Sequence, residues 1–237
     1  MVETYQHGLP LLAAGQAQKH VTVNEALARI DAVAQLRVVS DAQAVPPAGA
    51  LDGQAYVVPE GASGAWAGKA GLVALFANGG WVFLGPRAGW RAWNEAAGAA
   101  MVHDGAGWIE GALDAGAGGA ATLHRVLEVD HALGQGTSVS VPGAIPSGAL
   151  VIGVTGRVLA ALGGAATSWR LGVPGSDDRY GSGLGKGAGS HASGLTGAPV
   201  AYYGDTDLVL SGEGGGLDGG VVRLAVHLLA LRPPRAG

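Results

Sequence analysis

The chain contains no cysteine among its 237 residues. A disulfide framework and a metal site built from thiolates are therefore both excluded. Charge is also sparse, because 14 Lys and Arg residues against 18 Asp and Glu residues give a formal net charge of −4. The basic residues are scattered singly, whereas nucleic-acid binding depends on clustered cations that replace phosphate counterions. We therefore expect no nucleic-acid partner.

Long apolar runs are missing as well. The longest, residues 221–231, is interrupted by Arg223 and His227, whereas a membrane-spanning helix needs about 20 apolar residues. No basic segment precedes the short apolar run at residues 9–14, so we expect no signal peptide. The sequence thus predicts a protein that is made in the cytoplasm and has no membrane partner.

Glycine is abundant instead, with 44 residues and no Gly-X-Y period that would indicate collagen. Each glycine inside a helix costs roughly 0.5–1 kcal/mol relative to alanine, which excludes a helical bundle. The composition therefore predicts a mostly β protein of short strands and turns.

One helical region is predicted, within residues 1–40. Thr22 and Glu25 have the spacing of a capping box, so a helix is expected to begin there. An apolar stripe follows at steps of four, three and four: Val23, Leu27, Ile30 and Ala34. The stripe packs either on the chain's own β domain or against the same helix of another copy. We interpret residues 1–40 as a docking or oligomerisation arm, with residues 15–20 as a docking peptide or a plain loop.

Residues 41–113 are predicted to form a small β module rich in tryptophan. Strands at 72–76 and 81–84 flank Asn78-Gly79, a pair that suits the positive φ angles of a hairpin turn. A second hairpin is expected from residues 101–103 and 108–110. Small-residue turns precede Trp66, Trp81 and Trp108 in the same way.

Residues 114–122 are an Ala- and Gly-rich segment that we interpret as a linker. Residues 123–237 are predicted to form a β-sandwich of the jelly-roll type, because short strand candidates alternate with Gly, Ser and Asp turns. The last strand, 221–231, alternates clearly, with Val222, Leu224, Val226 and Leu228 expected to face the core. Residues 174–199 are predicted to be a long loop.

Motifs for catalysis and cofactors are weak. Residues 181–187 resemble a phosphate loop but lack its first glycine and its final Ser or Thr, and no GxSxG motif marks a nucleophilic serine. The acidic residues of the second half, Asp177, Asp178, Asp205, Asp207 and Asp218, read as solvated turns or as the carboxylates of a glycosidase. We expect no enzyme and no cofactor, and if any metal binds, calcium at Asp205 and Asp207.

Aromatic platforms give a better-supported binding chemistry, because a ring held at a rigid turn stacks on the flat C–H face of a sugar. Trp81 and Trp108 are expected in the core. Trp90 and Trp93 are expected to be exposed, next to the polar Arg91 and Asn94. In the second half the carbohydrate-binding candidates are Tyr180, Tyr202 and Tyr203, and one of the adjacent pair must face outward if both lie in a strand.

The opening of the chain resembles a family of proteins of unknown function from α-proteobacterial phages and gene transfer agents. The resemblance rests on Leu9-Pro10, on residues 16–27 (QAQKHVTVNEAL), on residues 61–68 (GASGAWAG) and on the run from residue 152 to residue 185. It implies a head-spike or tail-fibre component on the surface of a particle, whose gene-transfer-agent versions engage capsular polysaccharide. It supplies no catalytic residues. It also implies a closed oligomer, with a trimer favoured over a pentamer, and other particle proteins as partners.

We therefore predict a non-enzymatic attachment protein that binds cell-surface polysaccharide. The alternative is a purely structural decoration or adaptor protein of the particle. A glycan-degrading enzyme that uses Asp205, Asp207 or Asp218 is the third interpretation.

Overall fold

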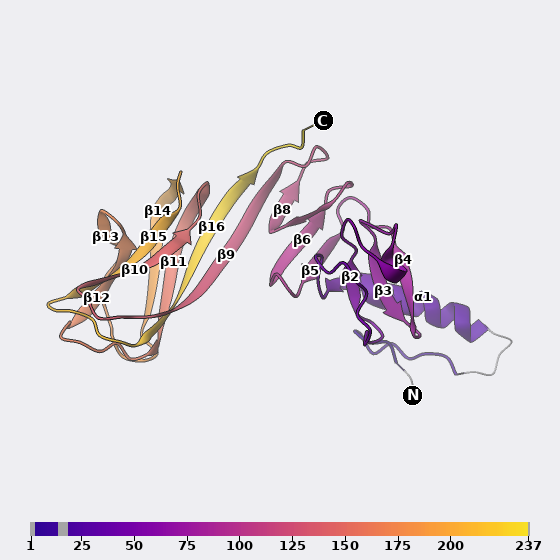
Figure 1. Cartoon of the computed structure of the whole chain (residues 1–237), viewed down its shortest axis with the longest axis horizontal. Helices are drawn as coiled ribbons and strands as arrows, with labels where there is room; N and C mark the ends of the chain where they lie inside the picture. The colour runs from indigo at the N-terminus through magenta and orange to yellow at the C-terminus, as the bar shows by residue number, and fades with distance from the viewer. Residues whose placement is uncertain (1–2, 14–18, 237) are drawn as a thin grey trace. The chain divides into compact units, whose positions relative to one another are not determined.

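The computed structural model describes residues 3–13 and 19–236. The chain divides into two compact units: Met1–Ala121 with Pro233–Gly237, and Thr122–Arg232. In both, most of the regular elements are strands, which confirms the mostly β prediction (Figure 1). The division falls within the segment predicted as a linker, where β8 (Ala112–Ala115) ends and β9 (Ala121–Ala132) begins.

The helix α1 (Lys19–Ala34) belongs to the first unit. It begins before Thr22, so the predicted start at a capping box is wrong. Glu25 is instead part of an ion pair one turn along the helix, with 2.5 Å between its Oε1 and Nη2 of Arg29. Of the predicted docking peptide, residues 15–18 lie outside the described residues.

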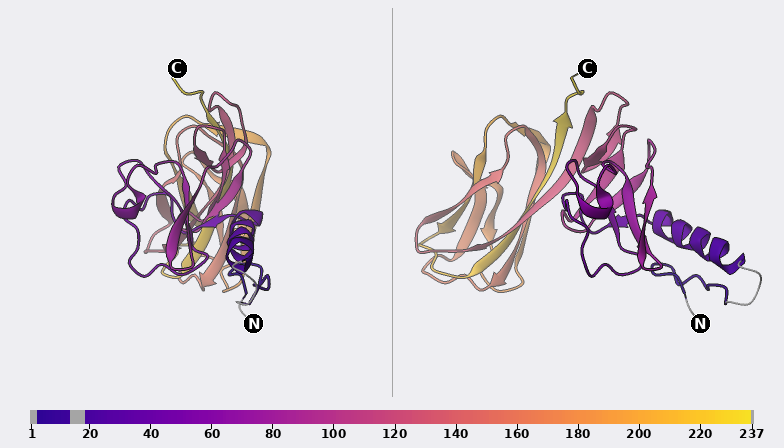
Figure 2. Two further views of the ribbon diagram at one scale, coloured as in Figure 1. Left: turned by 90° about the vertical axis from the view of Figure 1, so that its right-hand side faces the viewer. Right: turned by 45° about the vertical axis from the view of Figure 1, so that its right-hand side comes forward.

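The N-terminal segment runs alongside α1 (Figures 1 and 2). The Asn24 side chain fastens it, accepting a hydrogen bond from the Leu12 amide at 2.9 Å and donating one to the Leu12 carbonyl at 3.1 Å. Asp31 and Ala32 are buried on the inner side of the helix. The predicted apolar stripe faces away from the chain: Val23, Ile30 and Ala34 are exposed and Leu27 is partly exposed. Among the described residues, the stripe therefore does not pack on the chain's own β domain.

The first unit contains two sheets. One has the order β1-β5-β6-β7 and the other β2-β3-β4. Their strands are β1 (Arg37–Val38), β2 (Ala55–Val57), β3 (Val73–Ala77), β4 (Gly80–Leu84), β5 (Arg91–Asn94), β6 (Ala99–His103) and β7 (Trp108–Glu110). Both predicted hairpins are confirmed, and Asn78 (φ 52°) and Gly79 (φ 75°) form the turn between β3 and β4.

Tryptophan builds much of the core of this unit. Trp66, in the short 3₁₀ helix Gly64–Trp66, is fully buried and meets Trp81 edge to face at 5.0 Å between ring centroids. The ring centroids of Tyr56 and Trp66 lie 5.2 Å apart. Trp90 and Trp108 pack, partly buried, against a neighbouring cluster that includes Val73 and Met101. Aromatic area therefore substitutes for the aliphatic side chains that this segment lacks.

The second unit is a β-sandwich with jelly-roll strand order, as predicted. One sheet has the order β10-β15-β12-β13 and the other β14-β11-β16-β9. Figure 2 shows the two layers. Apart from β12 and β13, which form a hairpin, successive strands from β9 to β16 alternate between the two sheets. The remaining strands are β10 (Ser138–Ile145), β11 (Ala149–Ala160), β12 (Ser168–Val173), β13 (Ser176–Leu184), β14 (His191–Tyr202), β15 (Thr206–Glu213) and β16 (Val221–Arg232).

The alternation predicted for the last strand is confirmed. Val222, Leu224, Val226 and Leu228 of β16 are buried between the sheets, whereas Arg223 is exposed on the outer face. Trp169, Leu171, Leu208 and Leu210 fill the same core from the opposite sheet. The long loop predicted at 174–199 is wrong, because these residues form β13 and most of β14. Their glycines hid the strand pattern: a Cβ on Gly194 would lie 2.3 Å from the Tyr180 carbonyl oxygen, so close packing requires glycine there.

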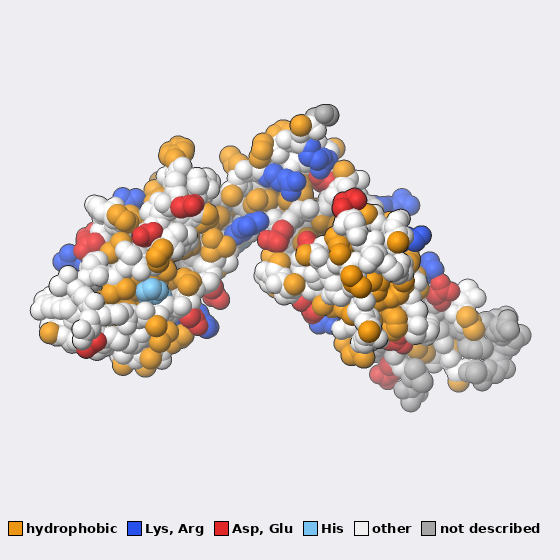
Figure 3. Space-filling view, in the orientation of Figure 1, with side chains coloured by type: hydrophobic (Ala, Val, Ile, Leu, Met, Phe, Trp, Pro, Cys, Tyr) orange, Lys and Arg blue, Asp and Glu red, His pale blue; other side chains and the backbone are white. Residues whose placement is uncertain are grey.

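Lys and Arg side chains are scattered over both units on the face drawn in Figure 3 rather than gathered in one patch. Within the described residues, no helix has the length and apolar character that crossing a membrane requires.

Candidate functional site

An open hollow in the first unit has the chemistry of a binding site. It has a volume of about 460 Å³ and is lined by Tyr5, Gln6, Gln35, Leu36, Arg37 and Trp93. We call it the Tyr5–Trp93 hollow. The volume lies within the usual range of small-ligand sites, roughly 300–1,000 Å³. It combines two partly exposed aromatic rings with two side-chain amides and one guanidinium group.

The sheet fixes Trp93. Along β5 the side chains alternate, so Ala92 and Asn94 are buried while Arg91 and Trp93 face outward. The Trp93 amide donates a hydrogen bond of 2.9 Å to the Leu36 carbonyl, and Trp93 is the register partner of Arg37 on the parallel strand β1. The ring stays 47% exposed. A large aromatic surface is thus held in water by a rigid backbone.

Asp31 of α1 fixes the other side of the hollow. Its buried carboxylate accepts hydrogen bonds from the Thr4 hydroxyl and from the amides of Gln6 and His7, each at 2.8 Å. The Gln6 side chain also donates a hydrogen bond of 3.3 Å to the Asp31 carbonyl. These bonds hold the residues on both sides of Tyr5. Burial alone raises the pKa of Asp31, but the amide and hydroxyl donors outweigh it and leave the pKa below its usual value.

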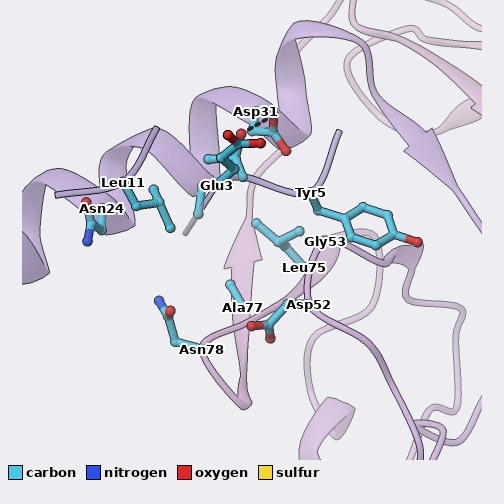
Figure 4. Close-up of a pocket in the computed structure, with 12 residues that line it drawn as sticks. Glu3, Tyr5, Leu11, Asn24, Asp31, Asp52, Gly53, Leu75, Ala77 and Asn78 are labelled. Atoms are coloured by element: carbon cyan, nitrogen blue, oxygen red, sulfur yellow. Dashed lines mark hydrogen bonds between the residues drawn. The ribbon is translucent and has the colours of Figure 1, made fainter. Parts of the chain in front are cut away.

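Tyr5 takes its position because residue 53 is glycine. A Cβ on Gly53 would lie 2.3 Å from the Tyr5 Cβ, and Gly53 has a φ of +89° that other residues rarely adopt. Figure 4 shows Tyr5 beside Gly53, with its ring directed away from Asp31. The neighbouring pocket drawn there has a volume of only about 60 Å³, so it has little room for a ligand. Tyr5 itself is 52% exposed.

Arg37 gives the hollow a partly neutralised cation. Its Nη1 lies 3.0 Å from Oε1 of Glu95, and both side chains are partly exposed. Such a pair contributes little stability in water but presents donors and acceptors in fixed positions. The arrangement suits a ligand with many hydroxyl groups better than one of high charge.

The four predicted carbohydrate contacts among residues 90–94 differ in their exposure to solvent. Trp93 lines the hollow and Arg91 is exposed, with one guanidinium nitrogen bonded to the Leu113 carbonyl at 3.1 Å. Trp90 is half-buried against the core, so the prediction of an exposed Trp90–Trp93 pair needs correction. Asn94 is 0% exposed and donates to the Asp41 carboxylate at 3.0 Å, which removes it as a surface contact.

The three predicted tyrosine contacts of the second unit also differ in their exposure to solvent. Tyr180 and Tyr202 are buried in the sandwich, and their hydroxyl oxygens lie 2.7 Å apart. Neither ring can stack on a sugar from solution, so both predictions are corrected. Burial, together with the bond to Tyr202, raises the pKa of the Tyr180 hydroxyl. Tyr203 is 92% exposed at the end of β14 and stays a predicted contact.

The two aspartates proposed for calcium hold turns. Asp205 accepts a hydrogen bond from the Ser147 amide at 2.8 Å, and Asp207 accepts one from the Gly143 amide at 2.9 Å. In the part of the chain that the structure describes, no three His, Asp or Glu side chains gather as metal ligands would. The turn role accounts for both carboxylates.

One segment of the chain matches a known protein family. Residues 23–109 match a family model described as a protein of unknown function (DUF2793). The match spans less than half of the chain and includes Gln35, Leu36, Arg37 and Trp93 of the hollow, but not Tyr5 or Gln6. It agrees with the predicted resemblance to a family of unknown function over these residues. No curated protein matches the chain.

Among solved structures, one titled "Cyanophage Pam1 capsid asymmetric unit" is similar in part. Its identity to this chain is 26% and its TM-score is 0.36, and the match covers 45% of this chain and 84% of that chain. The TM-score is too low for the match to bear on fold or function.

Sequence reasoning found Trp93 but missed its partners. Tyr5 and Gln6 are distant from Trp93 in sequence, and Asp31 brings them to the hollow. The signal in the sequence was Asp31, an acidic residue that lies beside Ala32 on the inner side of α1. A buried carboxylate needs donors, and here the N-terminal loop supplies them.

Proposed function

We propose that the chain is a non-enzymatic attachment protein of a phage-like particle that binds cell-surface polysaccharide through the Tyr5–Trp93 hollow. The observation that carries the proposal is the exposed Trp93 ring, held by two neighbouring strands and bordered by amide and guanidinium groups. Aromatic faces bind the apolar faces of sugars, while polar groups beside them bind the hydroxyls.

The placement on a particle rests on the resemblance of residues 9–27, 61–68 and 152–185. The jelly-roll order of the second unit is compatible with it, since this architecture occurs in viral capsid proteins and in lectins. Fold alone does not assign a function, so the proposal depends on the hollow.

The exposed stripe on α1 supports self-association as part of this role. Val23, Leu27, Ile30 and Ala34 repeat with the four-three spacing by which helices of a coiled coil meet. Within the described residues Ile30 is 54% exposed and Val23 40% exposed, so apolar side chains of the stripe face outward. We propose that equivalent helices of other copies cover the stripe, with a trimer favoured over a pentamer.

Binding is tested on an array of bacterial capsular oligosaccharides with the purified full chain. Trp93→Ala should abolish binding of the oligosaccharides that the wild type retains, because both the stacking surface and its edge are lost. Leu51→Ala, which shortens an exposed apolar side chain elsewhere in the unit, is the matched control and should bind as the wild type does. Equal binding by wild type and Trp93→Ala would refute the site, and no binding by the wild type would favour a purely structural particle protein.

Self-association is tested by sedimentation velocity. Ile30→Asp places a charge in the middle of the stripe and should convert the oligomer to a monomer. Val45→Asp places the same charge at an exposed position outside the helix and should leave the oligomer intact. A wild type that sediments as a monomer at all concentrations would exclude the helix contact.

A further inference from the structure

A second hollow lies in the other unit, on the outer face of the sheet that contains β11 and β16. It has a volume of about 330 Å³. Four strands line it: β14 with His191 and Ser193, β11 with Thr155 and Arg157, β16 with Arg223, and β9 with Glu128. We call it the outer-face hollow. These side chains point away from the core because they alternate with buried ones such as Val158 and Leu224.

The strand register sets three residues, two arginines and one histidine, in one row across this face. Arg157 is the direct partner of Arg223 on one side and of His191 on the other. Directly opposed side chains have Cβ atoms about 4.5–5.5 Å apart, and like charges placed in this way repel each other. A chain that only had to fold would gain nothing from facing two arginines toward each other.

One of the two arginines has its charge balanced and the other does not. Arg223 forms a two-pronged ion pair with Asp130, at 2.6 and 2.7 Å. Arg157 donates to the Gly189 carbonyl at 3.0 Å, and among the residues that the structure describes it takes part in no ion pair. The Arg157 guanidinium therefore has remaining donors beside the hollow, which suit a carboxylate.

The other lining groups suit hydroxyls. Ser193 and Thr155 supply side-chain oxygens, and the Thr155 hydroxyl is already placed by the His227 Nε2 at 3.0 Å. Thr155 and Ser193 are direct register partners on β11 and β14, two residues from Arg157 and His191. Glu128 lies on β9, on the other side of Arg223 from Arg157. An arginine beside two hydroxyl side chains suits a sugar that carries a carboxylate.

We propose that the outer-face hollow binds a uronic acid residue, with its carboxylate at Arg157 and its hydroxyls at Ser193 and Thr155. The second unit would then recognise acidic polysaccharide independently of the Tyr5–Trp93 hollow. Because the two sites share no residue, either proposal can fail while the other stands.

The test uses the full chain and three monosaccharides: glucuronate, galacturonate and glucose. In NMR titrations at millimolar concentration, at least one uronate should shift the backbone amide signals of Arg157, Ser193 and Arg223, and glucose should not. Arg157→Gln should weaken the uronate response about tenfold, as loss of a charge-assisted hydrogen bond does. Arg179→Gln removes an exposed arginine of the same unit outside the hollow and is the matched control.

Folding of the variant provides a second readout. Because Arg157→Gln relieves the repulsion between opposed arginines, its thermal midpoint should equal or exceed that of the wild type. Identical titrations for the wild type and Arg157→Gln would overturn the proposal, as would the absence of any shift with both uronates. Trp93→Ala should leave these titrations unchanged, which separates this site from the first.

Discussion

Replacing Asp104 with asparagine tests how the first unit holds its C-terminal tail. The Asp104 carboxylate is fully buried and accepts hydrogen bonds from the Ala106 and Gly107 amides, both at 2.9 Å, and from the Arg235 guanidinium. Burial alone raises the pKa of Asp104, but these donors outweigh it and lower the pKa from 3.8 to about 2. Asparagine keeps an acceptor for the amides but loses the charge that pairs with Arg235.

The magnitude follows from the pKa. A folded-state pKa below the unfolded value means that the carboxylate stabilises the fold above about pH 4 and that this contribution is lost as the pH falls through 2. The shift corresponds to about 2.5 kcal/mol at pH 7 and to roughly half of that at pH 3. Asp104→Asn should therefore lower the free energy of unfolding of the first unit by about 2 kcal/mol at pH 7 and by clearly less at pH 3.

Urea denaturation followed by tryptophan fluorescence measures this difference, since five of the six tryptophans belong to the first unit. Arg235→Gln should produce a similar loss at pH 7, and Asp114→Asn, at an exposed position, should have little effect. A loss of equal size at pH 7 and pH 3 would show that the charge of Asp104 is not what stabilises the unit.

Three further variants test the position of Tyr5, the hydrogen bonds of Asp31 and the packing of Trp169. Gly53→Ala should cost about 1–3 kcal/mol in unfolding free energy, because the new Cβ collides with Tyr5 at a positive φ, and it should weaken binding on the oligosaccharide array. Asp31→Asn should release the N-terminal loop, which faster amide hydrogen exchange at Gln6 and His7 would reveal, whereas unchanged exchange would contradict the clamp. Trp169→Ala should destabilise the second unit by about 3–5 kcal/mol in thermal unfolding, because the ring is buried in the sandwich core.

Local signals in the sequence predicted the elements whose shape depends on neighbouring residues. The turn at Asn78-Gly79 requires two positive φ angles, and few residue pairs other than this one supply them readily. The last strand was equally clear, because the large apolar side chains of Val222, Leu224, Val226 and Leu228 recur at every second position and are buried. The number and spacing of such segments also indicated a β-sandwich in the second half, although the strands within residues 174–199 were not predicted.

Elements that depend on distant contacts were not predictable in this way. Residues 174–199 have too few large side chains to show a strand period, yet the partner strands β11 and β12 impose one. Tyr180 was predicted to be an exposed ring in a glycine-rich loop, but its side chain is buried in the core. Local composition reports the conformational freedom of a segment and not the surface against which it packs.

The candidate site shows the same division. Side chains alternate along β5, so Trp93 faces outward and Asn94 is buried. A prediction that this strand begins at Arg91 would have distinguished the two residues from the sequence alone. Tyr5 and Gln6 needed the bonds to Asp31, which join the N-terminal loop to the last turns of α1. Such a contact has no local period and emerges only from the folded chain.

The most direct test of glycan binding at the Tyr5–Trp93 hollow is an NMR titration of the six indole N–H signals with an oligosaccharide that the array selects. The signal of Trp93, assigned by its disappearance in Trp93→Phe, should shift progressively and saturate, while those of the buried Trp66 and Trp169 stay in place. A saturating titration in which the Trp93 signal does not move would contradict the account.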